Sequence, residues 1–213
     1  MRIEQSMIAV VNIGVGNLTS VILAFNRACP EVDVRIASER KTLRDASRVV
    51  FPGQGSMRDC IERLNSLDMV DELRRCLVTK PFLGICLGKQ ILFDYSEEGR
   101  SQGLGFFPGK VKRFKKKNAV KIPHMGWNTV RIERNHPVFR GILNSNGEKA
   151  YFYFVHSFFS QPDDNRLVLG KTMHGEVFTS VISRENIFAT QFHPEKSSEN
   201  GIMLLKNFAG WNP

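Results

Sequence analysis

A cysteine flanked by two glycines, where an apolar run meets a helical pattern, constrains this chain more than any other feature. Residues 81–85 are apolar and predict a strand, residues 87–95 predict a helix, and Cys86 lies between them. A sharp turn from strand to helix requires small neighbours, which Gly84 and Gly88 provide. The turn presents the thiol at the carboxyl edge of a sheet and at a helix N-terminus, where thiolate is favoured. The pattern predicts a nucleophile elbow; a small buried core cysteine is the alternative reading.

The order of apolar and amphipathic segments predicts an α/β fold. In the first half, strands are expected at 7–11, 32–37 and 48–51, and helices at 18–28, 57–65 and 67–79. In the second half, strands are expected at 104–114, 128–132, 151–159, 167–171, 177–182 and 187–192, before a closing helix at 198–209. Alternating strands and helices indicate a mostly parallel sheet flanked by helices, and the later strands add antiparallel ones.

Length and composition predict one domain over residues 1–213. The chain is 42% hydrophobic, which is enough for one sizeable core, and no repeat or linker divides it. It has no apolar run long enough for a membrane span, and residues 1–6 do not resemble a signal peptide, so a cytoplasmic location is expected. The four cysteines lack Cys-x-x-Cys spacing, so we expect free thiols, no metal site and no cofactor.

The charge is strongly positive, at +9 with a sequence pI near 9.6. The densest basic stretch is 110–117, followed by Lys121. A solvated loop is one explanation, and a surface that docks onto an acidic partner is the other. No zinc-finger, RNP-like or heptad pattern accompanies the stretch, so nucleic-acid binding is not expected.

Two glycine-rich turns follow predicted strands. Gly14-x-Gly16 lacks the third glycine of a dinucleotide fingerprint, so a tight turn that presents Asn17 is the better interpretation. Residues 52–55 (Pro-Gly-Gln-Gly) follow the strand at 48–51 and can expose backbone N–H groups at the sheet edge. Cys86 also follows a predicted strand, so we expect it at the same edge of the sheet. Parallel sheets bind ligands outside the carboxyl ends of their strands, which makes this edge the expected site.

A thiol nucleophile needs a base, and the base needs an orienting group. His193 directly follows the last predicted strand, and Glu195 lies two residues on, on the same side of an extended chain. A carboxylate there fixes the tautomer of the imidazole and stabilises its protonated form. Of the other histidines, His156 fits a satisfied strand position. The remaining three lie in loop-like or polar contexts: His124, His136 and His174.

The two motifs together resemble the class I (triad-type) glutamine amidotransferases. They are residues 84–90 (Gly-Ile-Cys-Leu-Gly-Lys-Gln) and 191–197 (Gln-Phe-His-Pro-Glu-Lys-Ser). Residues 52–55, 123–128 and 153–157 narrow the resemblance to the glutaminase subunits of imidazole glycerol phosphate synthase. It covers nearly the whole chain and implies a flavodoxin-like fold. It also implies hydrolysis of glutamine through a cysteine thioester, with the ammonia channelled to a (β/α)8-barrel cyclase subunit in a heterodimer for histidine biosynthesis.

The resemblance also implies roles for individual residues. The expected triad is Cys86, His193 and Glu195, and the expected oxyanion-hole donors are Leu87 with the Gln54–Gly55 segment. The expected glutamine contacts are Gln90, Glu98 and Ser157. The expected partner-facing residues are Asn17, Met125, Trp127 and Lys196.

Several positions depart from the usual family pattern, among them Lys89, where an apolar residue is common, and Gln54, where valine is common. These departures leave a second function open, a paralogous subunit that feeds ammonia to a related barrel, for example in surface-sugar amidation. A thiol peptidase on the same fold is disfavoured by Gln90 and Glu98, which suit an amino-acid substrate. A binding protein with a dead site is disfavoured by the intact triad.

Overall fold

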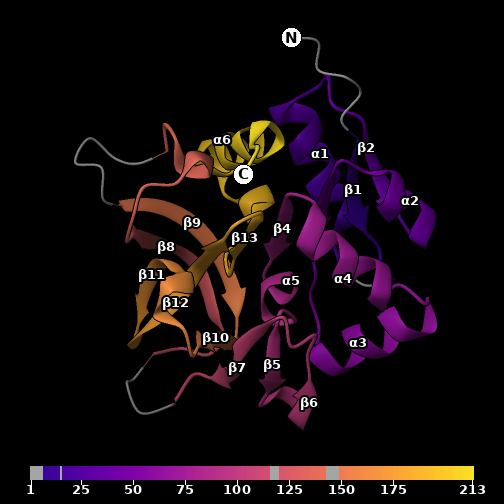
Figure 1. Ribbon diagram of the computed structural model, residues 1–213. Coiled ribbons are helices and arrows are strands. Elements are labelled where there is room, and N and C mark those ends of the chain that lie inside the picture. Colours follow the sequence, from indigo (N-terminus) through magenta and orange to yellow (C-terminus); the bar gives the residue numbers. More distant parts are fainter. Residues whose placement is uncertain (1–6, 15, 116–119, 143–148) are drawn as a thin grey trace.

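Two sheets organise the computed structural model, which describes residues 7–14, 16–115, 120–142 and 149–213 (Figure 1). The larger sheet contains β1 (Ile8–Val11), β2 (Val34–Ala37), β3 (Arg48–Phe51), β4 (Phe82–Ile85), β8 (His124–Ile132), β9 (Lys149–His156), β11 (Val168–His174), β12 (Glu176–Arg184) and β13 (Ile187–Thr190). Its strand order is β2-β1-β3-β4-β13-β12-β11-β8-β9. The strands from β2 to β13 run parallel and those from β13 to β9 antiparallel, so the predicted fold class is confirmed.

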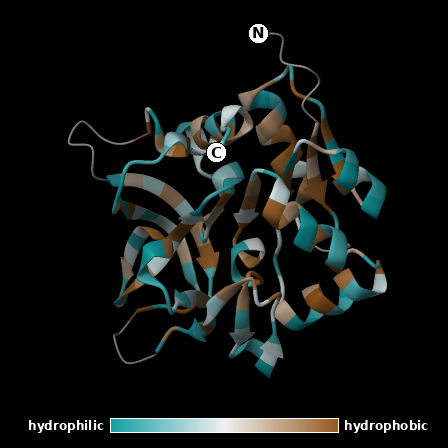
Figure 2. Cartoon of the chain, viewed as in Figure 1, coloured by the Kyte–Doolittle hydropathy of each residue, from teal (hydrophilic) through white to brown (hydrophobic). Residues whose placement is uncertain are grey.

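The central strands are buried on both faces because helices cover each side. Along β1, Ile8 and Val10 pack with α1 (Leu18–Ala28) and α6 (Ser198–Gly210). The alternate residues, Ala9 and Val11, belong to the other core, with α2 (Arg40–Asp45), α3 (Met57–Ser66) and α4 (Val70–Thr79). In Figure 2 the hydrophobic colours gather on the central strands, and much of the hydrophilic colour lies on the outer helices. This two-sided burial explains why β1 and β4, and β3 after Arg48, read as continuous apolar runs.

The predicted helix over 87–95 is wrong beyond Gln90. Helix α5 (Leu87–Gln90) is short, and the chain then forms β5 (Phe93–Ser96) in the smaller sheet. The other strands of this sheet are β6 (Ser101–Gln102), β7 (Phe107–Arg113) and β10 (Phe158–Pro162), in the order β10-β7-β5-β6. Phe93 is fully buried, and the Asp94 carboxylate accepts a hydrogen bond from Gly109 N–H at 2.9 Å. Pairing with β7 therefore overrides the local helical preference.

Other differences also arise from tertiary pairing. The segment 124–127, which precedes the strand expected at 128–132, belongs to β8, and β8 pairs with β9 from His124↔His156 to Arg131↔Lys149. The predicted strand over 151–159 is split at Ser157, and its two parts lie in different sheets. Helix α2 was not predicted, and α4 starts at Val70 because Asp68 has a left-handed backbone with φ 55°.

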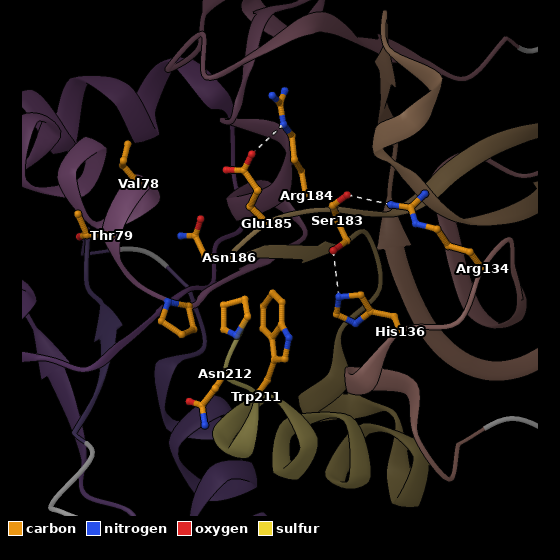
Figure 3. Close-up of a pocket in the computed structure, with 12 residues that line it drawn as sticks. Val78, Thr79, Arg134, His136, Ser183, Arg184, Glu185, Asn186, Trp211 and Asn212 are labelled. Atoms are coloured by element: carbon orange, nitrogen blue, oxygen red, sulfur yellow. Dashed lines mark hydrogen bonds and ion pairs between the residues drawn. The ribbon is translucent and has the colours of Figure 1, made fainter.

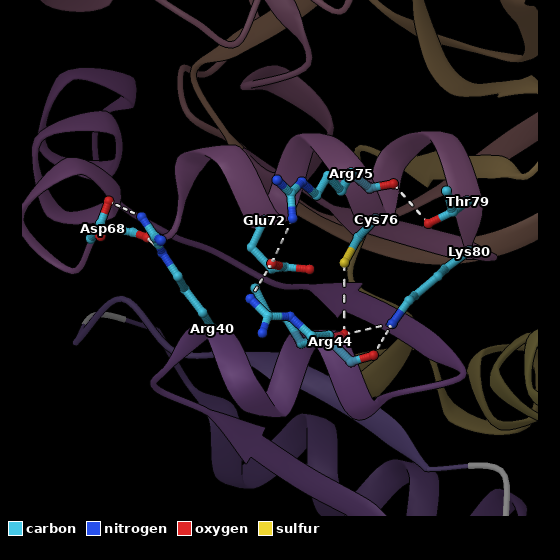
Figure 4. A network of polar contacts seen from close by, with 9 residues as sticks. Arg40, Arg44, Asp68, Glu72, Arg75, Cys76, Thr79 and Lys80 are labelled. Carbon is cyan, nitrogen blue, oxygen red and sulfur yellow. Dashed lines mark hydrogen bonds and ion pairs between the residues drawn. The ribbon is translucent and has the colours of Figure 1, made fainter.

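A polar network ties α2 to α4 (Figure 4). The Lys80 ammonium donates to three carbonyl oxygens at the end of α2, those of Leu43 (2.7 Å), Arg44 (2.7 Å) and Ala46 (2.6 Å). The Arg44 guanidinium also contacts the buried Glu72 carboxylate at 3.2 Å. A cation at these carbonyls satisfies acceptors that have no partner within the helix. The network thus fixes α2 against the helix that leads into β4.

Three expectations drawn from composition can be compared with the structure. Within the described ranges, no helix has both the length and the apolar character needed to cross a membrane. All four cysteines are buried free thiols. In the basic stretch, residues 110–113 belong to β7, which pairs with β10, whereas 116–119 lie outside the described residues.

Candidate active site

Cys86 occupies a strained turn between β4 and α5. Its backbone has φ 53° and ψ −103°, a left-handed conformation that is costly for a residue with a side chain. The neighbouring glycines are required sterically, because a Cβ on Gly84 would lie 2.6 Å from Gly88 O. A Cβ on Gly88 would lie 1.8 Å from Phe51 O. The predicted elbow is therefore present, and it holds the thiol at the carboxyl end of β4.

His193 reaches the same edge because β13 runs parallel to β4, with Thr190 opposite Ile85. The next residues form a 3-10 turn (Pro194–Lys196), which brings the Glu195 carboxylate to 2.8 Å from His193 Nδ1. Both side chains are almost fully buried, with 9% and 4% of their surface exposed. The Ser197 hydroxyl fixes the turn by donating to His193 O at 2.6 Å. This arrangement aligns carboxylate, imidazole and thiol at one edge of the sheet.

The negative charges of Cys86 and Glu195 stabilise a protonated His193. Burial favours the neutral imidazole, but the Cys86 thiolate and the Glu195 carboxylate outweigh it and raise the pKa of His193 to about 10. The second ring nitrogen, Nε2, is buried and makes no well-aligned hydrogen bond with any described residue. His193 is therefore an imidazolium at neutral pH, with one N–H oriented by Glu195 and the other available for a reaction.

The other three thiols lack these features. Burial raises the pKa of Cys29 to about 11 and that of Cys60 to about 12, and it also raises the pKa of Cys76. Their side chains belong to the two hydrophobic cores. Such thiols are inert, because the thiolate is the reactive species.

A pocket of about 340 Å³ lies in front of Cys86 and His193. It brings together all the residues expected at the oxyanion hole and the glutamine site: Gln54, Gly55, Leu87, Gln90, Glu98 and Ser157. The Gln90 amide donates to Phe158 O at 2.9 Å, which holds it against β10. Burial raises the pKa of Glu98, an effect that a hydrogen bond with Met57 N–H partly offsets. Among the described residues, no group of His, Cys, Asp and Glu side chains could hold a metal ion.

A known protein family and its curated members match nearly the whole chain. The family model described as glutamine amidotransferase class-I matches residues 14–210. The chain belongs to this family. Among curated relatives of this amidotransferase, "imidazole glycerol phosphate synthase subunit HisH" of Aromatoleum aromaticum is 44% identical, covering 98% of this chain and 100% of the relative. The HisH subunit of Neisseria meningitidis is 41% identical, covering 95% and 99%.

Solved structures support the fold of this amidotransferase. PurLQS from Thermotoga maritima superposes with a TM-score of 0.74 at 18% identity, covering 97% of this chain and 98% of that one. The glutaminase domain of Trypanosoma brucei CTPS, with bound acivicin, superposes with a TM-score of 0.63 at 16% identity, covering 98% and 96%. The arrangement of both sheets is therefore that of the family.

The residues expected to face a partner fall into two groups. Asn17 and Lys196 line a small crevice beside Glu195, and the Asn17 carboxamide also caps α1 by accepting from Ser20 N–H at 3.2 Å. Met125 and Trp127 lie on β8, where they are 63% and 54% exposed. Two large apolar side chains exposed two residues apart on one strand share a face, as expected of an interaction surface.

Sequence reasoning assigned no role to two polar residues at this site. The Gln191 amide donates to Cys86 Sγ at 3.6 Å and is fully buried; its position as a polar residue within the last predicted strand before His193 was the available signal. Lys89 is also fully buried, in α5 three residues after the nucleophile. A charged residue between Gly88 and Gln90, so close to the nucleophile, was the sequence signal for a role of Lys89. Another position was misjudged: His124 is not in a loop but is buried in β8, 2.9 Å from His156.

A larger hollow, of about 760 Å³, lies at the other end of β4 and β13 (Figure 3). It is lined by Pro81 and Asn186, which precede those strands, whereas Cys86 follows β4. Its charged side chains already have internal partners, since the Arg134 guanidinium donates to Val168 O at 2.8 Å and Ser183 O at 3.0 Å. It contains no thiol, so its size does not make it the reactive site.

Proposed function

We propose that this amidotransferase is the glutaminase subunit of an imidazole glycerol phosphate synthase, working as one domain of residues 1–213 in the cytoplasm. One structural observation supports the glutaminase activity most strongly. A buried Glu195–His193 pair lies beside the Cys86 thiol, at a pocket that also contains Gln90 and Glu98. Its HisH relatives, at 41% and 44% identity over nearly the whole chain, carry the name of that synthase.

In the proposed reaction, the Cys86 thiolate attacks the side-chain amide carbon of glutamine and forms a tetrahedral oxyanion. His193 gives its Nε2 proton to the leaving nitrogen, so that ammonia departs and a glutamyl thioester remains. The now neutral imidazole takes a proton from water, which attacks the thioester. Glutamate leaves, and the proton on His193 restores the starting pair. Glu195 keeps the imidazole in the required tautomer throughout.

The oxyanion is assigned to two backbone donors. Leu87 is the first residue of α5, so its N–H has no acceptor within the helix and is available beside Cys86. The second donor is assigned to the Gln54–Gly55 segment, where Gly55 has φ 96°. Each donor lowers the barrier by about 3 kcal/mol. Gln90, Glu98 and Ser157 then hold the amino-acid end of glutamine, with the Glu98 carboxylate against its ammonium group.

The proposed partner is a (β/α)8-barrel cyclase subunit in a heterodimer. Met125 and Trp127 give the contact its apolar part, and Asn17 and Lys196 place it beside the triad. Ammonia released at Cys86 would enter the barrel without meeting bulk water. Glycine lets the Gly55 peptide adopt either of two orientations at low cost, so partner binding can select the productive one. We therefore expect the isolated subunit to be a poor glutaminase.

Reconstitution with the cyclase subunit from the same genome tests this proposal. Glutamate release is measured for the chain alone, for the complex, and for the complex with the cyclase's nucleotide substrate. We expect little release from the chain alone and at least a tenfold rise in the complex, with formation of imidazole glycerol phosphate. Full turnover by the chain alone would contradict the gating. Binding to a different barrel protein, and not to the cyclase, would favour the paralogous pathway.

A further inference from the structure

Lys89 is a charged residue in a place where charge is costly. Its side chain is fully buried, in the first turn after the nucleophile. The ammonium donates to Ser160 Oγ at 2.5 Å on β10 and to Thr179 O at 2.8 Å on β12. It therefore lies between the two sheets, behind the elbow. A buried ammonium must be paired or hydrogen-bonded to be tolerated, and the reaction proposed above gives it no role.

The candidate for a compensating anion is the nucleophile, because Lys89 N–H donates to Cys86 O at 3.1 Å in the same turn. None of the ion pairs among the described residues includes Lys89. Burial lowers the pKa of Lys89 to about 7, and the Cys86 thiolate opposes that effect. The other titratable group that interacts with it is His156, which burial keeps neutral. A favourable interaction between two groups stabilises the charged form of both, so an ammonium at Lys89 also favours the thiolate.

We propose that Lys89 is a positioning residue whose ammonium, held by Ser160 and Thr179, places a positive charge behind Cys86 and favours the thiolate form of the nucleophile. This inference rests on the proposed function in one respect, namely that Cys86 is the reacting thiol. Lys89 does not touch the substrate; it acts through the charge of Cys86. His193 alone transfers a proton, and Lys89 contributes only the charge of its ammonium form.

The test is the pH dependence of Cys86 alkylation in the full chain. Iodoacetamide labelling is followed by mass spectrometry of the Cys86 peptide from pH 5 to 9, for the wild type, Lys89→Met and Lys89→Gln. Met keeps the shape without charge, and Gln keeps a hydrogen-bond donor without charge. We expect both variants to move the half-maximal pH upward by about one unit, the low end of a neighbouring charge's effect. The rate at pH 6 then falls about tenfold.

The control is Lys206→Met, which removes the same charge from an exposed position on α6 and should leave the half-maximal pH unchanged. A purely structural Lys89 would lower the urea midpoint of both neutral variants but leave the alkylation profile in place, and that result would overturn the inference. If neither neutral variant folds, the same labelling is done with Ser160→Ala, which removes one of the two hydrogen bonds of the Lys89 ammonium. Its half-maximal pH should move upward by a smaller amount, and an unmoved profile would again overturn the inference.

The inference and the proposed function can fail separately. Glutamine hydrolysis by the wild-type complex is measured on the same preparations. An active wild type with unmoved profiles in the variants contradicts the role of Lys89 alone. An inactive wild-type complex whose alkylation profile still shifts in the variants contradicts the glutaminase assignment and leaves the electrostatic role standing.

Discussion

Glu195 determines how His193 is charged and which of its nitrogens can act. The carboxylate lies 2.8 Å from Nδ1 and helps to raise the pKa of the imidazole against the effect of burial. Because that pKa is about 10, the imidazolium needed to protonate the departing ammonia persists through neutral pH and is lost only as the pH approaches 10.

Replacing Glu195 with Gln should therefore change the pH profile as well as the rate. The lost negative charge lowers the pKa of His193, so the alkaline fall of kcat/KM moves to lower pH. We expect kcat to drop by about 10⁴-fold, the effect of losing such a carboxylate from a triad. Steady-state rates of the complex at pH 6 to 10 provide the measurement. Glu199→Gln is the matched control, because that carboxylate is exposed and pairs only with Arg27 in the described chain. An unchanged alkaline limb in Glu195→Gln would refute the role of Glu195.

The sequence allowed reactive residues to be predicted when they directly follow a strand. Cys86 and His193 each follow a buried apolar strand, and parallel neighbours bring such ends together. Lys89 and Gln191 could not be assigned in the same way. Their significance depends on burial depth and on partners 71 and 105 residues away, Ser160 and Cys86, which no local pattern specifies.

The elbow itself depends on Gly88. A Cβ at this position would lie 1.8 Å from Phe51 O on the neighbouring strand, and backbone atoms cannot yield without moving β3 or α5. We expect Gly88→Ala to lower the free energy of unfolding by about 3 kcal/mol or more, at the upper end of overpacking costs. Gly210→Ala is the control, since nothing lies within 4 Å of a Cβ there, and it should be neutral or stabilising by up to about 1 kcal/mol. Urea unfolding of both variants decides, and a Gly88→Ala protein as stable as the wild type would contradict the close approach of α5 to β3 at this turn.

The elements of the parallel half could be predicted closely, whereas several in the other half could not. Helix α1 and strand β3 have the expected bounds because their apolar periodicity faces a core that covers both sides of the sheet. Strand β5 was missed because 91–95 (Ile-Leu-Phe-Asp-Tyr) is compatible with helix or strand. The choice is made by β7, which pairs with β5 from a position more than ten residues along the chain.

The protein as a whole contains three buried or half-buried histidines that are neutral when folded. Burial lowers the pKa of His124 and of His136 to about 4, and that of His156 well below its ordinary value. Below pH 6.5 these histidines bind protons in the unfolded chain but stay neutral in the folded protein. The free energy of unfolding therefore decreases as the pH falls from 6.5 toward 4. His193 has the opposite sign: its raised pKa gives stability that is complete below pH 6.5 and is lost as the pH rises toward 10.

Three residues with lowered pKa values outweigh one with a raised value on the acid side. We therefore expect the urea midpoint to fall between pH 7 and pH 5, before most carboxylates titrate. Urea unfolding at half-unit intervals is the measurement. A midpoint that stays constant or rises over this interval would contradict the neutral state of these histidines in the folded protein.

The central claim is that Cys86 is the nucleophile of a glutaminase, and glutamate release by the Cys86→Ala complex tests it most directly. Loss of the thiol removes the covalent route, so the rate should fall by about 10⁴-fold or more. Cys29→Ala, which removes a buried core thiol, should remain active. Added ammonium should still support the synthase reaction in Cys86→Ala, because the partner's site is intact. A Cys86→Ala complex that releases glutamate at a tenth of the wild-type rate or faster would contradict the account.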